Sequence, residues 1–455
     1  MNTKKRKIGL FGAVILTVGF IIGSSVFVMV PTIAGIAGPS VFLAYAFASI
    51  PTILCGIAMI QLSGVLPVTG GPFIAVSRYI SPSVSFVMAA GAVVAMAAAN
   101  CLNAYGAAAF IRLYLPEANT VLIAFIILGG FCILNLFDIK LMTFIEGVMV
   151  VMLILTMLII GLGGMPSVSP ANMDPLFPNG MTAFFMAIAI AIFSWLGLTA
   201  LANFSGDIKN PKRNIPMAIF LSIIVLFILY VTVSYSIVGN MNWKEVSELG
   251  AGGTMVAISN FLSGPLVNVL TIGAIMAILT TVNAIIMVSA KSMIAFTNQK
   301  VLPPVFGKIN RFGSPYVSVI IFSAATMAGV AFAGSFEDYA LMAVYPGVAM
   351  QFLTAYAMYR LPKVDKESYD NATIKLNKFW LKFSLIGNAI LSVVIIVFAI
   401  LNSIPVLLVT IIMFALLVVY WFARKNYLKN RGLDLTKLAS ELSEETQSEI
   451  DSINE

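Results

Sequence analysis

The chain has 455 residues, of which 60% are hydrophobic and 10% are charged, and its mean hydropathy is +1.01. A soluble core of this size does not require so apolar a sequence, so the composition excludes a soluble globular protein and predicts an integral membrane protein. The chain contains no histidine, which excludes imidazole catalysis, histidine metal ligands and a histidine pH switch. Its cysteines, Cys55, Cys101 and Cys132, lie far apart in apolar segments and predict neither a disulfide framework nor a metal cluster.

Apolar segments of about 20 residues or more, the length that crosses ~30 Å of hydrocarbon, recur along nearly the whole chain. The sequence predicts twelve membrane-spanning helices, over residues 8–35, 40–66, 82–113, 119–137, 141–164, 182–204, 216–239, 264–297, 316–335, 337–360, 380–402 and 404–423. The first segment is too long for a cleavable signal peptide and lacks a small-residue cleavage site, so we expect it to remain as the first span. Longer loops are expected over 165–181, 240–263 and 361–379.

The distribution of basic residues predicts how the chain is oriented. Lys and Arg are retained on the cytoplasmic side of a membrane. With the N-terminus inside, all 26 Lys and Arg except Arg112 and Lys244 fall in cytoplasmic segments. We therefore expect a multi-pass protein of the plasma (inner) membrane with both termini in the cytoplasm. The formal charge of +7 follows from this topology and from basic loops against anionic lipid, and it does not indicate nucleic-acid binding.

Two apolar segments contain small residues near their middle: "FIIGSSVFV" (residues 20–28) in the first and "FSWLGLTA" (residues 193–200) in the sixth. A helix that unwinds in the bilayer frees backbone groups, which is tolerated where they line a polar cavity or meet a ligand. The half-helix that follows then offers N–H groups and a positive dipole end to a carboxylate. The same residues also suit a notch for close helix packing. Their spacing alone does not decide between the two interpretations.

Interrupted segments at corresponding places in two halves are typical of a secondary transporter built from an inverted repeat. We therefore predict one transporter domain over residues 1–431, with repeats over 8–164 and 182–360 and two additional helices over 380–423. Residues 432–455 contain seven acidic residues and one lysine. They are predicted to form an acidic cytoplasmic tail that is either a short solvated helix or disordered.

Four motifs carry a resemblance to a known family: "GFIIGSSVF", "LPVTGGPFIAVSRYISPSVSF", "GDIKNPKRNIP" and "NAIIMVSAKSMIAFTNQKVLPPVFGKINRFGSPY". In this order and spacing the sequence resembles the amino acid, polyamine and organocation (APC) transporters over spans one to ten. The resemblance implies an all-α integral membrane protein with a leucine-transporter-like 5+5 inverted repeat, two C-terminal helices, discontinuous first and sixth spans, and transport by alternating access.

The resemblance also implies a substrate site. In such families the substrate carboxylate meets the broken first helix, and the amino group meets backbone carbonyls of the first and sixth helices. Carried across by position, the first-helix cradle and the sixth-helix wall consist of Ile22, Gly23, Ser24 and Ser25, and of Phe193, Ser194, Trp195, Leu196 and Gly197. The family usually has Gly-Ser-Gly in the cradle, so Ser25 adds a side chain that either narrows the cradle or supplies a hydroxyl donor.

Within the family, the sequence resembles the basic amino acid and amine antiporters but departs from them at key positions. Asn100 matches an asparagine that contacts substrate. Phe193 takes the place of a gating tryptophan, Thr199 that of a glutamate tied to pH response, and Ile285 that of a tryptophan that stacks on a guanidinium. Two of these departures, the lost carboxylate and the lost stacking ring, argue against a dedicated arginine carrier, because cation–π stacking needs an aromatic face. We expect a neutral or weakly cationic amino acid or a related amine as substrate.

Coupling residues are less distinct in the sequence. Glu146 is the one acidic residue well inside a predicted span, and both helix packing and proton transfer remain open for it. Ser289 and Ser292 either supply hydroxyls to a sodium ion or bond back to their own helix. Lys291 is expected to anchor or gate the cytoplasmic end of the eighth span. No lysine stands in the fifth span. Proton coupling or exchange is favoured over sodium, the coupling ion is undetermined, and no metal or other cofactor is expected.

The sequence leaves three alternatives to a permease or antiporter of neutral or weakly cationic substrates. The alternative within the family is a polyamine or cationic amino acid/amine exchanger. A membrane-embedded enzyme would need convergent acids, a nucleophile with a base, or metal ligands within the spans, and the sequence offers little of these, so we expect no enzyme. A passive channel is the third. No obligatory protein partner is expected. The glycoprotein partner of eukaryotic relatives requires an exposed extracellular cysteine, and the sequence predicts none here.

Overall fold

A computed structural model describes the backbone of residues 8–23, 25–66, 70–137, 139–198, 201, 208–298, 300–331 and 334–433. These residues are almost entirely helical and contain no β-strand, apart from one isolated parallel bridge between Ile8 and Ile208. The Lys209 amide donates to the Ile8 carbonyl across this bridge at 2.8 Å. The prediction of an all-α protein is therefore confirmed for the described residues.

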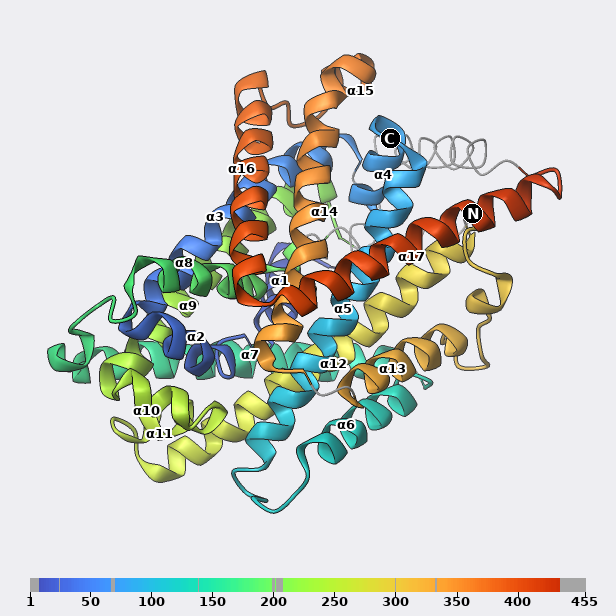
Figure 1. The fold of residues 1–455 in the computed structure, drawn as a ribbon. Coiled ribbons are helices and arrows are strands. Elements are labelled where there is room, and N and C mark those ends of the chain that lie inside the picture. Colours follow the sequence, from blue (N-terminus) through green and yellow to red (C-terminus); the bar gives the residue numbers. More distant parts are fainter. Residues whose placement is uncertain are drawn as a thin grey trace.

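The helices are arranged as one bundle in which segments far apart in sequence lie together (Figure 1). In chain order they are α1 (Leu10–Ile22), α2 (Met29–Ala37), α3 (Val41–Val65), α4 (Gly71–Tyr79), α5 (Pro82–Ile111), α6 (Thr120–Leu134), α7 (Ile139–Gly164), α8 (Gly180–Ala191), α9 (Pro211–Asn240), α10 (Trp243–Glu248), α11 (Ala251–Ser259), α12 (Gly264–Asn298), α13 (Tyr316–Ala331), α14 (Phe336–Val364), α15 (Lys366–Asp370), α16 (Lys378–Asn402) and α17 (Ile404–Lys429). The short 3-10 turns are η1 (Gly38–Ser40), η2 (Met165–Ser167), η3 (Pro170–Met173), η4 (Ile192–Trp195) and η6 (Pro304–Gly307).

Every predicted span contains a helix. Eight helical segments of the described chain are long and apolar enough to cross a membrane, and four more apolar helices are shorter: Leu10–Ile22, Thr120–Leu134, Gly180–Trp195 and Tyr316–Ala331. The fold is thus that of a multi-helix membrane protein, while the count of twelve crossings stays a prediction. The sequence did not predict the short helices α4, α10, α11 and α15, which occupy segments expected to be loops.

The first apolar segment is divided between α1 and α2. Helix α1 ends at Ile22 and α2 begins at Met29. Gly23 has φ 44° and ψ −130°, a conformation that residues with a Cβ rarely adopt. The residue type therefore explains why the helix stops here, and the interruption lies where the small residues of the sequence predicted it.

The sixth apolar segment also changes conformation near its middle. Helix α8 continues as the 3-10 turn η4 to Trp195, Leu196 is extended with ψ 152°, and Gly197 has φ 107°. The next long helix, α9, starts at Pro211. A proline at the first turn of a helix suits that position because its missing N–H would have no partner there.

Packing brings the two interrupted segments to the middle of the bundle. Helix α5 packs against α12 and α14, α3 packs against α9, and α1 contacts both α9 and α12. Helices α10 and α11 lie against or near α2 at one end of the molecule, and α4 and α15 lie at the opposite end (Figure 1). The largest buried side chains include Trp195, Tyr45, Tyr230, Phe27 and Phe110. Four of these five belong to the two interrupted segments or to helices α3 and α9, which pack beside them.

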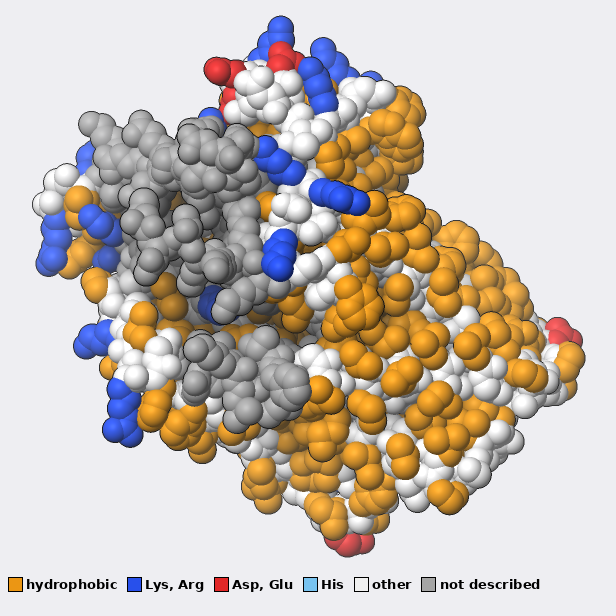
Figure 2. Space-filling model, turned by 180° about the vertical axis from the view of Figure 1, so that it is seen from behind, with side chains coloured by type: hydrophobic (Ala, Val, Ile, Leu, Met, Phe, Trp, Pro, Cys, Tyr) orange, Lys and Arg blue, Asp and Glu red, His pale blue; other side chains and the backbone are white. Residues whose placement is uncertain are grey.

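Much of the outer surface is apolar. Exposed hydrophobic side chains follow α16 and α17, among them Phe379, Ile390, Val393, Leu416 and Val419. Figure 2 shows a wide hydrophobic area nearly free of charged side chains, with Lys and Arg gathered at the upper and left parts of this face. Exposed apolar surface of this extent is costly in water and suits contact with lipid.

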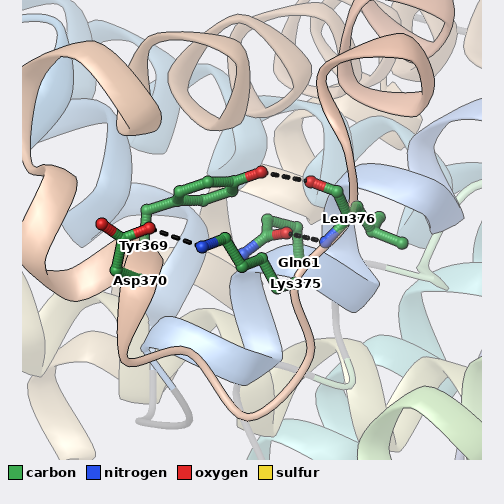
Figure 3. A network of polar contacts seen from close by, with 5 residues as sticks. All are labelled: Gln61, Tyr369, Asp370, Lys375 and Leu376. Atoms are coloured by element: carbon green, nitrogen blue, oxygen red, sulfur yellow. Dashed lines mark hydrogen bonds and ion pairs between the residues drawn. The ribbon is translucent and has the colours of Figure 1, made fainter.

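The connection between α14 and α16 is fixed to the end of α3 by polar contacts (Figure 3). The Gln61 Oε1 atom accepts from the Leu376 amide at 2.8 Å, and the Tyr369 hydroxyl donates to the Leu376 carbonyl at 2.6 Å. Asp370 and Lys375 form an ion pair beside them. The hydrogen bond from Lys375 holds the pKa of the exposed Asp370 carboxyl below its ordinary value.

A second ion pair joins α4 to the residue that follows α14. The Arg78 guanidinium lies 2.9 Å from the Asp365 carboxylate, and both side chains are partly shielded from solvent. The Tyr79 hydroxyl donates to the same carboxylate at 3.5 Å. Helix α4 is therefore anchored to α14 at the end of the molecule that also carries α15.

Candidate functional site

A cavity of about 100 Å³ lies between the two interrupted helices. Its wall comes from α1, α4, α5, α12 and α14, and from η4 with the residues that follow it. One water needs roughly 10–15 Å³ of such space, so the cavity has room for a small molecule. Most of the wall is apolar, and its side-chain polar groups belong to Asn103, Thr281 and Gln351. No charged side chain is among the described residues that line it.

Six of the predicted site residues line this cavity. They are Ile22, Gly23, Phe193, Leu196, Gly197 and Ile285. Four others that the structure describes, Ser25, Ser194, Trp195 and Asn100, are buried but are not part of its wall. Ser24 and Thr199 lie outside the described residues. The fold thus brings the first, sixth and eighth predicted spans together at one cavity, and the binding role of each residue stays a prediction.

Gly23 and Gly197 lie where a larger residue would collide with the neighbouring helices. A Cβ atom on Gly23 would lie 2.7 Å from Asn103 Oδ1 and 3.0 Å from Thr281 Cγ2. A Cβ atom on Gly197 would lie 3.0 Å from Phe20 Cδ1. Both positions also have positive φ, so conformation and space each require glycine. Both residues line the cavity, so their backbone forms part of its wall.

Ser25 does not narrow the cavity. Its side chain is buried at 1% exposure, and its hydroxyl lies against the Ile22 carbonyl and 3.2 Å from the Tyr230 hydroxyl of α9, so either oxygen can accept its proton. The Ser25 carbonyl accepts from the Tyr45 hydroxyl of α3 at 2.6 Å. The additional side chain at this position therefore supplies a hydroxyl, and that hydroxyl faces the bundle behind the cavity wall.

Ser194 and Trp195 are held from the same side. The Ser194 carbonyl accepts from the Tyr230 hydroxyl at 2.7 Å. The Trp195 Nε1–H donates to the Tyr45 carbonyl at 3.0 Å, and the Trp195 carbonyl accepts from Thr52 Oγ1 at 3.2 Å. Several carbonyls within the interruptions are thus already bonded to hydroxyls of α3 and α9. Gly23 and Gly197, by contrast, line the cavity.

Helix α5 presents Asn103 to the cavity in place of the predicted Asn100. The Asn103 Nδ2 atom donates to the Ala99 carbonyl at 2.7 Å. Asn100 is fully buried, and neither polar atom of its amide has a hydrogen-bond partner within the described part of the chain. Ala92, Met96 and Ala99, spaced three to four residues apart, line the cavity together with Asn103. Residues at this spacing lie on one face of a helix, so the small residues Ala92 and Ala99 on the face of Asn103 were the sequence signal for its position.

Gln351 and Thr281 were also missed from the sequence. Gln351 on α14 is 4% exposed, and its Oε1 atom has no hydrogen-bond partner among the described residues. Leaving such a group unsatisfied costs about 1–3 kcal/mol, so a ligand or water that bonds to it is favoured. The Thr281 Oγ1 atom lies 3.4 Å from the Gly19 carbonyl oxygen of α1 and 3.3 Å from the Ala277 carbonyl oxygen, so either carbonyl can accept its proton.

The residues considered for coupling are scattered. The Ser289 hydroxyl lies 3.2 Å from the Met96 sulfur, whereas Ser292 bonds back to the Val288 carbonyl of its own helix at 3.0 Å. Lys291 is exposed on α12. Glu146 belongs to α7, and its side chain lies outside the described structure. Among the side chains that are described, no group of three or more Cys, Asp or Glu residues could hold a metal ion.

A cavity between two interrupted helices, inside a bundle of apolar helices of membrane length, defines the class of multi-pass membrane transporters. The chain belongs to the amino acid permease family, whose model matches residues 8–437. The resemblance found in the sequence is thereby confirmed. The family and the named relatives are transporters, so the protein is a transporter and not an enzyme.

The relatives carry several transport activities in their names. The branched-chain amino acid permease of Bacillus subtilis is 24% identical over 342 residues, which cover 70% of this chain and 73% of that permease. The methylthioribose transporter of Bacillus subtilis is 26% identical over 333 residues, covering 68% of this chain and 71% of that protein. The chloroplastic cationic amino acid transporter 9 of Arabidopsis thaliana is 25% identical over 331 residues, which cover 67% of this chain and 57% of that transporter.

Proposed function

We propose that the protein is a secondary active transporter, a permease or antiporter, that carries a neutral or weakly cationic amino acid or related amine by alternating access. The observation that carries this proposal is the uncharged wall of the cavity between the interrupted helices. A cation taken from water into such a wall loses hydration without gaining a countercharge. A zwitterionic amino acid instead meets backbone dipoles at the interruptions, which suit both of its charged groups.

In the proposed complex, different parts of the substrate contact different residues of the wall. The polar end of the substrate lies at Gly23 and Gly197, which line the cavity, with Asn103 and Thr281 beside Gly23. The substrate side chain lies among apolar residues of the wall, such as Ile285. Because this remainder is apolar, we favour a neutral amino acid with an apolar side chain within the proposed class. The name of the branched-chain amino acid permease among the relatives supports this choice.

The alternative is a polyamine or cationic amino acid/amine exchanger, which the name of the Arabidopsis relative suggests. A guanidinium or polyamine site needs a carboxylate or a stacking aromatic ring. Ile285 lines the cavity where the resemblance predicts the stacking ring of basic amine antiporters. We therefore rank this alternative second.

The proposal includes the predicted topology. Twelve spans, arranged as repeats over residues 8–164 and 182–360 with two further helices over 380–423, would place both termini in the cytoplasm of a cell with the protein in its inner membrane. The gathering of Lys and Arg at one part of the surface, away from the wide apolar area, supports this orientation (Figure 2). Coupling by proton or by exchange is proposed, without a sodium site.

The test is counterflow in liposomes that contain the purified protein. A thermal-shift screen against the twenty amino acids and their decarboxylated amines first identifies ligands, since a ligand that binds only the folded state raises its apparent stability. Liposomes preloaded with unlabelled leucine are then mixed with labelled leucine and with competitors. We expect saturable counterflow that isoleucine, valine and methionine inhibit and that arginine and putrescine do not. Counterflow of arginine or putrescine, with none of any neutral amino acid, would overturn the assignment.

A further inference from the structure

The Tyr230 hydroxyl touches both interrupted helices. Tyr230 lies on α9 and is fully buried. Its hydroxyl donates to the Ser194 carbonyl in η4 at 2.7 Å, and its oxygen is placed to accept from Ser25 Oγ, 3.2 Å away in the interruption between α1 and α2. One side chain of a third helix therefore bonds to both segments whose backbone flanks the cavity.

Tyr45 completes a closed ring of contacts. The Tyr45 hydroxyl donates to the Ser25 carbonyl at 2.6 Å, and its own carbonyl accepts from Trp195 Nε1 at 3.0 Å. The aromatic rings of Tyr45 and Tyr230 lie 5.4 Å apart, and those of Trp195 and Tyr230 lie 5.2 Å apart. From Ser25 the contacts run through Tyr230 to Ser194, along the chain to Trp195, and through Tyr45 back to Ser25. Every member of the ring is buried.

The ring of contacts fixes the two segments where the interruptions remove helical hydrogen bonds. An intact helix fixes the position of each residue by hydrogen bonds to the turns above and below it. At Gly23 and Gly197 the helical pattern stops, so their separation depends on contacts with other helices. We propose that Tyr230 is a positioning residue that ties the two interrupted segments together, so that Gly23 and Gly197 keep a fixed separation in the cavity wall.

This assignment rests on the proposed function, because it supposes that the substrate binds between the two segments. It also accounts for Ser25, whose hydroxyl faces Tyr230 and not the cavity. A tyrosine that serves packing alone would keep its role as phenylalanine, since the ring contacts remain. Tyr235 is the matched control: it lies on the same helix and packs edge-on against Phe42 of α3 at 5.2 Å.

The first experiment needs no substrate. Hydrogen–deuterium exchange is measured on the purified full chain for the wild type, Tyr230→Phe and Tyr235→Phe. We expect Tyr230→Phe to exchange about two- to tenfold faster in both segments, residues 19–28 and 192–197, which is the effect of losing one hydrogen bond. Tyr235→Phe should match the wild type in both. Faster exchange in only one segment, or in neither, would overturn the proposal.

A second variant, Ser25→Ala, tests the same contact if Tyr230→Phe cannot be purified. Ser25→Ala removes the other hydroxyl of the contact and introduces only a small side chain, so it should also raise exchange in residues 192–197, which Ser25 reaches through Tyr230. An effect confined to residues 19–28 would refute the tie. Where both single variants fold, the double variant should exchange no faster than the faster single one, because the same contact is lost in each.

Transport provides an independent readout. Liposomes with the wild type or a variant are preloaded with the twenty unlabelled amino acids and their decarboxylated amines, and are then given a ¹⁴C-labelled mixture of the same compounds. We expect Tyr230→Phe to accumulate label at least fivefold more slowly than Tyr235→Phe at equal protein. If the wild type takes up no label, the proposed function fails, while hydrogen–deuterium exchange still tests whether Tyr230 links the two segments. If the wild type transports but Tyr230→Phe changes hydrogen–deuterium exchange in only one segment, the positioning role of Tyr230 is refuted and the proposed function is not.

Discussion

Replacing Gly23 by alanine tests whether the interrupted first helix is the substrate cradle. The residue has φ 44° and ψ −130°, so an alanine there adopts a sparsely populated backbone conformation at a cost of about 1–3 kcal/mol. Its Cβ atom would also lie 2.7 Å from Asn103 Oδ1, closer than real Cβ atoms approach an oxygen, so Asn103 must move. Both effects act on the cavity wall.

The expected result is a loss of transport while the protein stays in the membrane. A penalty of about 1–3 kcal/mol on the substrate-binding arrangement corresponds to a roughly 5- to 150-fold lower uptake rate at subsaturating substrate. Uptake is measured in liposomes with equal amounts of protein that elutes as a single species in size exclusion. Leucine is the labelled substrate, or else the amino acid with the largest thermal shift.

Gly130→Ala is the matched control. Gly130 lies on the exposed side of α6, and a Cβ atom there would have no neighbour within 4 Å. Alanine favours helix over glycine by about 1 kcal/mol, so this variant should transport like the wild type and be no less stable. Wild-type uptake by Gly23→Ala would refute the reasoning, because it would mean that neither the backbone conformation nor the space at this position matters for transport.

Three further outcomes follow from other polar groups. Gln351→Leu removes the polar group of α14 from the cavity. It should weaken competition by serine or threonine for leucine uptake up to about tenfold and leave leucine uptake itself near wild type. An equal loss for polar and apolar amino acids would contradict a role of Gln351 in selectivity. Gln61→Leu leaves the Leu376 amide without its acceptor and should lower the free energy of unfolding by about 1–3 kcal/mol, seen as a lower melting temperature. The pKa of Asp370 is lowered by Lys375 in the folded state, so the stability it adds is present above the ordinary carboxyl pKa and disappears as the pH falls through the folded value. Asp370→Asn should therefore lower the melting temperature slightly at pH 7 and not at all in strong acid; a larger effect in acid would reverse the sign of this argument.

The sequence predicted the helices and the places where two of them are interrupted, because both depend on local properties. Apolar length determines a membrane helix, and Gly23 and Gly197 have φ values that only glycine adopts readily. Helices α10 and α11 escaped prediction because short helices in a loop form through contacts that periodicity does not encode.

The side-chain directions at the site could be predicted only in part. On α5 the match by position indicated Asn100, while the rotation of the helix presents Asn103, one turn further on, to the cavity. In the interruptions the side chains have no period at all, so nothing local indicated that Ser25 and Trp195 face α9 and α3. Such directions depend on which helices pack nearby. Gln351 lies on α14, where its place in the cavity depends on the packing of α14 against α5.

The anchoring of α4 has a consequence for how the environment acts on the cavity. Pro72 and Phe73 at the start of α4 form part of the cavity wall, and Arg78 at its end is bound to Asp365 at the partly shielded surface. Any displacement of α4 away from α14 must separate a guanidinium from a carboxylate. Because dissolved ions screen that attraction, the energetics of widening the cavity on this side depend on ionic strength and on the charge of nearby lipid headgroups.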